Sequence, residues 1–427
     1  MAEERYEDEL IKTRHRKKKN RKSGGAVKGR VSQNSVKVDF RVTEKERNRY
    51  YLAAAGKYRA ARYLTVIILF VFLLVMLLFF RESITYSNLM YLVRDLDADV
   101  GFSTTAYNSF SYDGRYVEDF ALFKGRIAVA GTDGLTMYDS SGSREAEYNG
   151  DYTAPRLETG EKYALLYDAG EKNYSLYTSV SKVLSSEAEE NIEAAAVSDS
   201  GTYALLTHSK ESKFLVTVYN SAFKAVTKYY KDKYVTDIAL DSQGDRGAIV
   251  SAFSENAVIC AEVTLCEVGS EKTQSFTYGG LMPLSAEYTD DGTLIVACDT
   301  AILAFGESGE KWRYDFNGSL PSSCTVSGNT VACACAANAI GSVNTVLVFD
   351  TDGTVRYNVT LEHKVSAVAT DSRYAVYAAG DSQVSRIDLS DGGVKTESLS
   401  SPAVRLLAPE GCLVVCHEDG TGSYFSE

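Results

Sequence analysis

Residues 63–80 read YLTVIILFVFLLVMLLFF, an apolar run of 18 residues without a charged residue, proline or glycine. Backbone polar groups inside hydrocarbon must form hydrogen bonds within their own segment, so a single run of this length predicts a transmembrane α-helix. A buried helix of a globular domain would show a polar solvent face, and a cleaved signal peptide would have a shorter apolar core behind a short basic leader. The chain on either side of the run is therefore expected to lie in two compartments.

The charges on the two sides of the apolar run are opposite. Residues 1–62 contain 19 Lys and Arg against 8 Asp and Glu, whereas residues 81–427 contain 26 against 49. Lys57, Arg59 and Arg62 lie directly before the run, and only Arg81 lies at its far end. Because short cytoplasmic flanks collect Lys and Arg, the sequence predicts a cytoplasmic N-terminus and an extracytoplasmic C-terminal domain in the cell membrane.

The segment 1–62 is a basic tail that we expect to be mostly disordered, because it has too few apolar residues to offset the entropy of ordering. Anionic lipid of the inner leaflet is one partner for its basic cluster. Another polyanion such as RNA is an alternative, although nucleic acid is the less favoured partner, and the tail can also serve only to fix orientation. The candidate lipid-binding or polyanion-binding residues are Arg16, Lys17, Lys18, Lys19, Arg21 and Lys22.

Residues 81–100 follow the apolar run and predict a short amphipathic stalk. Leu89, Leu92, Val93 and Leu96 fall at the i, i+3, i+4 and i+7 positions, which places them along one face of a helix. The following domain, the membrane surface or a second copy of the stalk could cover this face, and packing against the chain's own domain is the simplest of the three.

From about residue 101 onward, the pattern changes to period-two alternation in units of roughly 40 residues, the length of a four-stranded propeller blade. Such a sheet cannot bury both its faces alone, so blades pack side by side until the ring closes. The sequence therefore predicts an all-β fold, a β-propeller over residues 101–427. The second strands of eight blades are expected to begin near Arg126, Lys162, Thr202, Arg246, Thr293, Thr330, Tyr374 and Cys412.

The last predicted blade is one strand short, because only GTGSYFSE follows its second strand. Residues 103–112 precede the first complete unit and can supply the missing strand, which would join the two ends of the ring. Seven blades are the alternative, with residues 152–184 as an irregular unit. Asp-Gly pairs between apolar runs, such as Asp133-Gly134 and Asp291-Gly292, support the β interpretation, because glycine permits the positive φ of tight hairpins.

All eight cysteines lie after the apolar run, at positions 260, 266, 298, 324, 333, 335, 412 and 416. An even count outside the membrane is compatible with disulfides. However, Cys298, Cys333 and Cys416 occupy a small-residue position of the second strand that is Ala or Gly in other units. The pattern therefore favours free, buried thiols.

Chemical motifs are weak in this sequence. Cys333 and Cys335 lack a second pair at zinc-ligand spacing, and the segment with Asp350 and Asp352 lacks the remaining ligands of a calcium loop. No nucleophile elbow, phosphate loop or dinucleotide motif occurs in a fitting context. We therefore assign no catalytic, cofactor-binding or metal-binding residue and expect no cofactor. A non-enzymatic role is favoured over an enzymatic one. The axial funnel of a propeller is the expected place for a ligand.

The order of basic tail, apolar run, SNLMYLVRDLD stalk, FSYDGR entry and AVSDSGTYALL-type units resembles an uncharacterised family of single-pass, membrane-anchored β-propeller proteins of Gram-positive bacteria. This resemblance implies location and fold, and no catalytic residue. The segment AFGESGEKWRYDF, with Gly309 before Trp312, also resembles a quinoprotein-type propeller repeat, but it occurs once, and Trp312 is the single tryptophan of the chain.

Three functions follow from these expectations. The first, which we favour, is a binding scaffold that holds envelope proteins or wall polymer at the outer membrane face. The second is an extracellular sensor coupled to the basic cytoplasmic tail. The third and least favoured is a propeller hydrolase or lyase that uses the axial funnel.

Overall fold

The computed structural model describes residues 49, 55, 57–58, 60–72, 109–112, 117–336 and 343–426. The chain divides into two compact units, Met1–Ser83 and Ile84–Glu427. In the first unit, residues 60–72 are helical and exposed. Within the described residues, no helix combines the length and apolar character needed to cross a membrane. The second half of the predicted span, residues 73–80, lies outside the described residues, as do the predicted stalk and most of the basic tail.

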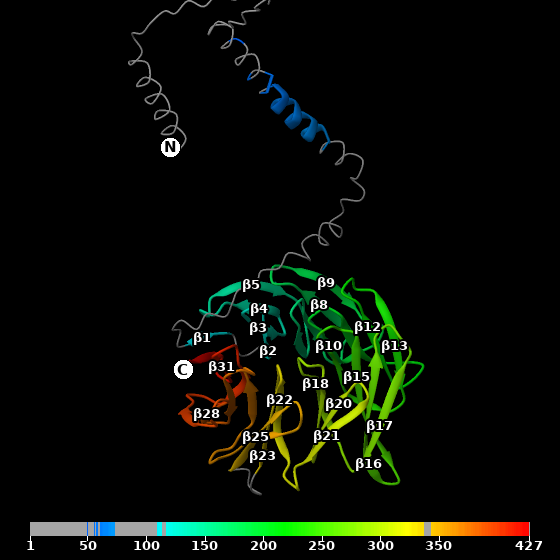
Figure 1. Cartoon of the computed structure of the whole chain (residues 1–427), viewed down its shortest axis with the longest axis vertical. Coiled ribbons are helices and arrows are strands. Elements are labelled where there is room, and N and C mark those ends of the chain that lie inside the picture. Colours follow the sequence, from blue (N-terminus) through cyan, green and yellow to red (C-terminus); the bar gives the residue numbers. More distant parts are fainter. Residues whose placement is uncertain are drawn as a thin grey trace, which may run out of the picture. The chain divides into compact units, whose positions relative to one another are not determined.

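The second unit is an all-β propeller of eight four-stranded sheets arranged around an axis (Figure 1). Blades 1 to 3 contain β2 (Val117–Phe123), β3 (Arg126–Gly131), β4 (Gly134–Tyr138), β5 (Arg144–Asn149), β6 (Pro155–Thr159), β7 (Ala164–Asp168), β8 (Asn173–Tyr177), β9 (Lys182–Glu187), β10 (Ile192–Val197), β11 (Tyr203–His208), β12 (Phe214–Tyr219) and β13 (Ala225–Lys231). Blades 4 and 5 contain β14 (Tyr234–Leu240), β15 (Arg246–Glu255), β16 (Val258–Glu267), β17 (Thr273–Gly279), β18 (Pro283–Tyr288), β19 (Leu294–Cys298), β20 (Ala301–Gly306) and β21 (Gly309–Asp315).

The remaining strands complete the ring. Blades 6 and 7 contain β22 (Pro321–Ser327), β23 (Thr330–Ala336), β24 (Asn344–Asp350), β25 (Val355–Leu361), β26 (Ala367–Thr370), β27 (Ala375–Ala379), β28 (Gln383–Asp388) and β29 (Val394–Ser398). Blade 8 contains β30 (Ala403–Leu407), β31 (Cys412–His417), β32 (Thr421–Ser426) and β1 (Ser109–Ser111). The predicted count of eight blades is confirmed, and residues 152–184 belong to a regular blade.

The two ends of the propeller close the ring in one sheet, as the sequence predicts. Strand β1 pairs antiparallel with β32 and places Phe110 opposite Gly422. A Cβ atom at Gly422 would lie 1.9 Å from the Phe110 ring, so only glycine leaves room for this close contact. Beside them, the Tyr112 hydroxyl donates a hydrogen bond to the carbonyl oxygen of His417.

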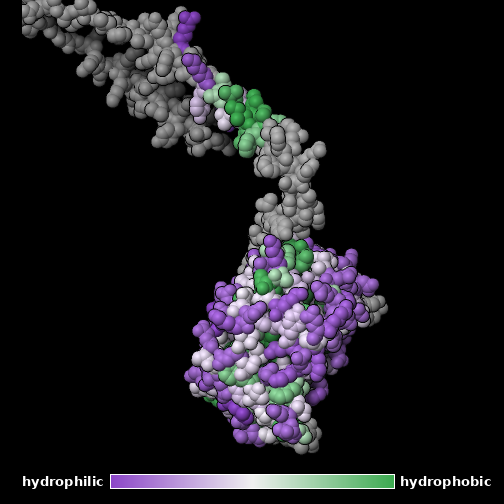
Figure 2. Space-filling view, turned by 90° about the vertical axis from the view of Figure 1, so that its right-hand side faces the viewer, coloured by the Kyte–Doolittle hydropathy of each residue, from purple (hydrophilic) through white to green (hydrophobic). Residues whose placement is uncertain are grey.

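The core consists of eight apolar clusters, and each lies between two neighbouring blades. Second strands contribute most to it because they are buried along almost their whole length, as in β3 and β19. The outermost strands alternate between buried or half-buried and exposed positions, as β25 does. The face of the propeller in Figure 2 is consequently mainly hydrophilic, with scattered hydrophobic residues.

The expectation of free thiols is confirmed for six cysteines and wrong for two. Cys260, Cys266, Cys298, Cys335, Cys412 and Cys416 are free and buried. Cys324 and Cys333 form a disulfide instead. The two residues lie directly opposite each other in the antiparallel pair β22–β23, with their Cα atoms 4.1 Å apart. Cross-strand geometry therefore pairs Cys333, which the small-residue argument assigned to packing, with Cys324, which that argument did not include.

Candidate functional site

The first strand of each blade lies nearest the axis, and six of these strands line a cavity of about 550 Å³. Its walls come from six blades, with residues of β2, β6, β18, β22, β26 and β30. Because these blades lie on different sides of the ring, the cavity is the axial channel itself (Figure 1). We call it the axial site.

Local irregularities in the first strands position several charged side chains. The pairing with the second strand shifts register directly before Asp119 in β2, before Asp237 in β14 and before Arg405 in β30. A bulge of this kind redirects the side chain that follows it. The three charged residues therefore occupy equivalent places in three blades.

Asp119 and Asp237 use their carboxylates to connect neighbouring blades. Asp119 accepts hydrogen bonds from its own strand at Phe120 N (2.9 Å) and from the next blade at Leu157 N (3.1 Å). Asp237 does the same with Ile238 N (2.9 Å) and with Ala286 N in the next blade (2.8 Å). These bonds join first strands that no sheet hydrogen bond connects.

Glu158 and Glu287 are the two glutamates that line the axial site. Glu158 is half-buried in β6. Glu287 is open to the channel in β18 and accepts a hydrogen bond from Val326 N in the next blade at 3.3 Å. Arg405 is the one basic side chain in the lining of this cavity, which it shares with these two carboxyl groups.

Burial near the axis raises the pKa values of three carboxyl groups, those of Glu158, Glu287 and Asp237. Burial is the largest cause for Glu158, the carboxylates of Asp119, Asp237 and Glu287 add to it, and Arg405 opposes it. The resulting pKa of Glu158 is about 8, against an ordinary value of 4.5. Burial also raises the pKa of Asp237 to about 6, against the effect of its backbone hydrogen bonds, and enclosure raises the pKa of Glu287.

The axial site can therefore accept hydrogen bonds, hold a positively charged group or exchange protons near neutral pH. Among the described residues, no group of three or more His, Cys, Asp or Glu side chains has the arrangement of a metal site. Spacing in the sequence did not reveal the axial site, because its residues lie in six strands far apart in the chain. The one local signal was an acidic residue in otherwise apolar first strands, such as Asp237 in YVTDIAL.

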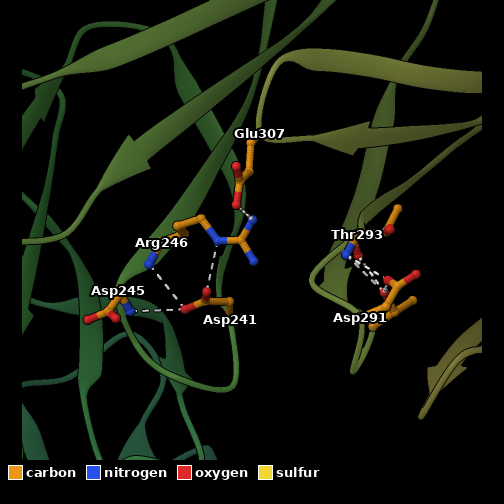
Figure 3. Close-up of polar contacts among 7 residues, drawn as sticks. Asp241, Asp245, Arg246, Asp291, Thr293 and Glu307 are labelled. Carbon is orange, nitrogen blue, oxygen red and sulfur yellow. Dashed lines mark hydrogen bonds and ion pairs between the residues drawn. The ribbon is translucent and has the colours of Figure 1, made fainter.

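A second and larger cavity of about 950 Å³ lies between blades 4 and 5. Figure 3 shows its polar end, where Asp241 accepts hydrogen bonds from the backbone N–H and the Nε of Arg246, and Arg246 Nη1 lies 3.5 Å from Glu307. Nearby, Asp291 accepts hydrogen bonds from the Thr289 hydroxyl and from Thr293 N. Partial burial would raise the pKa of Asp291, but these hydrogen bonds outweigh it and lower the pKa to about 2.

The residues that the sequence singled out for metal or quinone chemistry have structural roles. Cys333 is in the disulfide and Cys335 is buried, while Asp352 accepts a hydrogen bond from Thr354 N in the β24–β25 turn. Trp312 stacks on Phe349 of the next blade, with ring centroids 6.0 Å apart, and its Nε1 donates to the Thr351 carbonyl.

The roles predicted for the basic residues of the tail remain predictions. Lys57 and Arg62 are exposed residues of a helical segment. Arg59 lies outside the described residues. The same holds for the candidate lipid-binding residues Arg16, Lys17, Lys18, Lys19, Arg21 and Lys22.

Comparison with known proteins agrees with the fold. A family model described as "Family of unknown function (DUF5711)" matches residues 103–419. No curated protein matches the chain. Among solved structures, BamB from Moraxella catarrhalis is similar to the propeller, with 12% identity, a TM-score of 0.52, and coverage of 76% of this chain and 97% of that chain.

Two other solved structures are more distant. A eukaryotic initiation factor matches with a TM-score of 0.49 and 12% identity over 75% of this chain and 83% of that chain. Kluyveromyces lactis Hsv2 matches with a TM-score of 0.45 and 7% identity over 67% of this chain and 98% of that chain. At such identities, the likeness to BamB shows a shared propeller fold and nothing about ligands.

Proposed function

The chain belongs to the DUF5711 family of unknown function, and from its axial site we propose that it is a membrane-anchored extracytoplasmic β-propeller that binds envelope proteins or wall polymer as a scaffold. The observation that carries this proposal is the axial site, a charged cavity of about 550 Å³ inside a closed ring. Small-molecule sites of proteins are typically concave spaces of roughly 300–1,000 Å³ with a few convergent polar groups, so this cavity would take one segment of a polymer or of a partner protein. The residues from six blades that line it would present a preorganised surface to a partner.

Membrane anchoring is part of the proposal and is supported by the apolar run 63–80 and the basic residues before it. Protease added to intact cells should then remove epitopes at the C-terminal end and spare epitopes in residues 1–62. Protection of the C-terminal end would reject the proposed orientation.

Crosslinking in intact cells tests the binding function. We expect a defined set of envelope proteins, or wall polymer, to be captured through the propeller. Deletion of residues 12–30 should leave this set unchanged, because those residues belong to the cytoplasmic tail. Loss of every partner after this deletion would favour the sensor function instead.

The raised pKa values of Glu158 and Glu287 favour one second candidate, a hydrolase or lyase that uses them as general acid and base. Such an enzyme would process a captured polymer rather than only hold it. Under this alternative, Glu158→Gln would abolish turnover while polymer binding persists. Under the scaffold proposal, Glu158→Gln changes polymer binding. Neither the wild type nor this variant then converts the polymer into a product.

A further inference from the structure

The cavity between blades 4 and 5 is larger than the cavity of about 80 Å³ between blades 7 and 8. Its volume of about 950 Å³ lies at the upper end of the range for ligand sites. Strands β16 and β17 of blade 4 and β18 to β20 of blade 5 contribute to its walls. We call this cavity the interblade cleft.

The floor of the interblade cleft is apolar. The half-buried side chains of Leu265 and Tyr288 supply its accessible apolar surface, whereas Leu294 and Phe305 also line it but are almost fully buried. Phe305 is held in place by two aromatic neighbours in blade 4, Phe276 and Tyr278, with ring centroids 5.4 and 6.0 Å away. An apolar side chain of a ligand could therefore cover this floor without any rearrangement of the core.

The rim of the interblade cleft is acidic. Asp245, Glu267, Glu271 and Glu307 line it, and all four are exposed. Two basic residues line it as well. The charge of Arg246 is already balanced by the buried Asp241 at 2.9 Å, and Lys272 is the other. The rim therefore has an excess of negative charge.

The ion pairs on this rim are weak and exchangeable. Lys272 and Glu267 approach to 3.6 Å with side chains that are 83% and 60% exposed. Arg246 and Glu307 approach to 3.5 Å, and the Glu307 side chain is 85% exposed. Exposed pairs of this kind contribute little to stability, so their carboxylates are free to pair with a cationic ligand instead.

The free edge of a sheet borders the same cleft. Strand β17 is the last in the order of its sheet, and its first residues, Thr273 and Gln274, line the cleft. An extended peptide can add to such an edge through backbone hydrogen bonds while alternate side chains enter a pocket. From the apolar floor, the acidic rim and this edge together, we propose that the interblade cleft binds an extended basic peptide that carries apolar side chains at alternate positions.

Calorimetric titration of the full-length protein tests this proposal. The protein is held in nanodiscs of zwitterionic phosphatidylcholine, and the probe is an acetylated and amidated heptapeptide of alternating Lys and Leu. We expect saturable binding of this peptide with one site per propeller. Matched peptides of alternating Glu and Leu, or of alternating Lys and Ser, should bind at least about tenfold more weakly, because the first reverses the charge and the second removes the apolar side chains.

Variants locate the site. The double substitution Glu271→Lys with Glu307→Lys should weaken binding of the Lys-Leu peptide about tenfold or more, since both side chains are exposed and their replacement does not disturb the core. Leu265→Trp should weaken it by filling the cleft. The matched control, Glu362→Lys with Glu418→Lys, makes the same change in net charge at exposed positions outside the cleft and should leave affinity unchanged.

This inference is separate from the axial site, and Glu158→Gln should leave peptide binding unchanged. Equal binding of the Lys-Leu and Glu-Leu peptides would overturn the proposal. Equal loss of affinity in the cleft variant and in the control pair would also overturn it, because the peptide would then respond only to net charge.

Discussion

The Asp119 carboxylate in blade 1 accepts a hydrogen bond from the backbone N–H of Leu157 in blade 2, with an Oδ2 to N distance of 3.1 Å. The other oxygen accepts from Phe120 N at 2.9 Å. Asp237 joins blades 4 and 5 in the same way, through Ala286 N at 2.8 Å. Acidic residues near the axis thus connect neighbouring blades through backbone hydrogen bonds.

Removing one of these hydrogen bonds between blades should destabilise the propeller. Asp119→Ala leaves the N–H groups of Phe120 and Leu157 without their acceptor, and we expect a loss of about 1–3 kcal/mol in the free energy of unfolding. Asp119→Asn keeps one acceptor oxygen and should cost less. Urea unfolding of both variants measures the difference, and equal stability of Asp119→Ala and the wild type would contradict the role assigned to this carboxylate.

The axial carboxylates should make stability depend on pH. Because the pKa of Glu158 is raised to about 8, the folded state binds its proton more tightly than the unfolded state does. The contribution of Glu158 to stability is therefore fully present below its ordinary pKa of 4.5 and is lost as the pH rises toward 8. Asp237, with a pKa of about 6, contributes with the same sign over the lower part of this range.

Thermal unfolding at pH 5 and pH 8.5 measures this effect. We expect the wild type to unfold a few degrees lower at pH 8.5, since about 1 kcal/mol shifts Tm by about 2–4 °C in larger domains. Glu158→Gln removes the titrating group and should reduce the drop, whereas Glu362→Gln, at an exposed position outside the channel, should not. An identical pH profile for Glu158→Gln and the wild type would show that protonation of Glu158 does not cause the pH dependence of stability.

Ring closure depends on the contact between Phe110 and Gly422. A methyl group at position 422 would meet the Phe110 ring at 1.9 Å, so Gly422→Ala must displace that ring or separate β1 from β32. We expect a destabilisation of about 1–3 kcal/mol. Gly279→Ala is a matched control, because its added methyl group meets only Cys260 Sγ, at 4.0 Å. Chemical unfolding that ranks the control below Gly422→Ala in stability would contradict this description of closure.

Thiol counting tests the assignment of the cysteines. Alkylation of the denatured chain without reductant should modify six cysteines, and prior reduction should raise the number to eight. Mass spectrometry of the digested protein should place the two additional modifications at Cys324 and Cys333. Eight modified thiols without reductant would restore the expectation that all the cysteines are free.

The repeat pattern predicted the propeller well because its cause is local. Period-two alternation, Asp-Gly turns and the length of each unit are properties of one blade, and they gave the second-strand starts of all eight blades to within about two residues. The pairing of β1 with β32 followed from counting strands, since an incomplete last blade requires a strand from elsewhere.

The candidate sites were not predictable in the same way because they depend on contacts between distant blades. Glu158 and Glu287 come together only when the ring closes, and the interblade cleft depends on how two sheets pack. The disulfide was closer to prediction: the tight turn between β22 and β23 places Cys324 opposite Cys333, and extending the hairpin register from Gly328 would have paired them.

Site-specific photocrosslinking in intact cells tests the proposed scaffold function most directly. A photoreactive residue in place of Thr159 or Ser327, both in the lining of the axial site, should form adducts with the same defined envelope proteins or wall polymer. The same residue in place of exposed Val394, on the outermost strand of blade 7, should form few or none. Equal adduct patterns from all three positions, or adducts only with cytoplasmic proteins, would contradict the account.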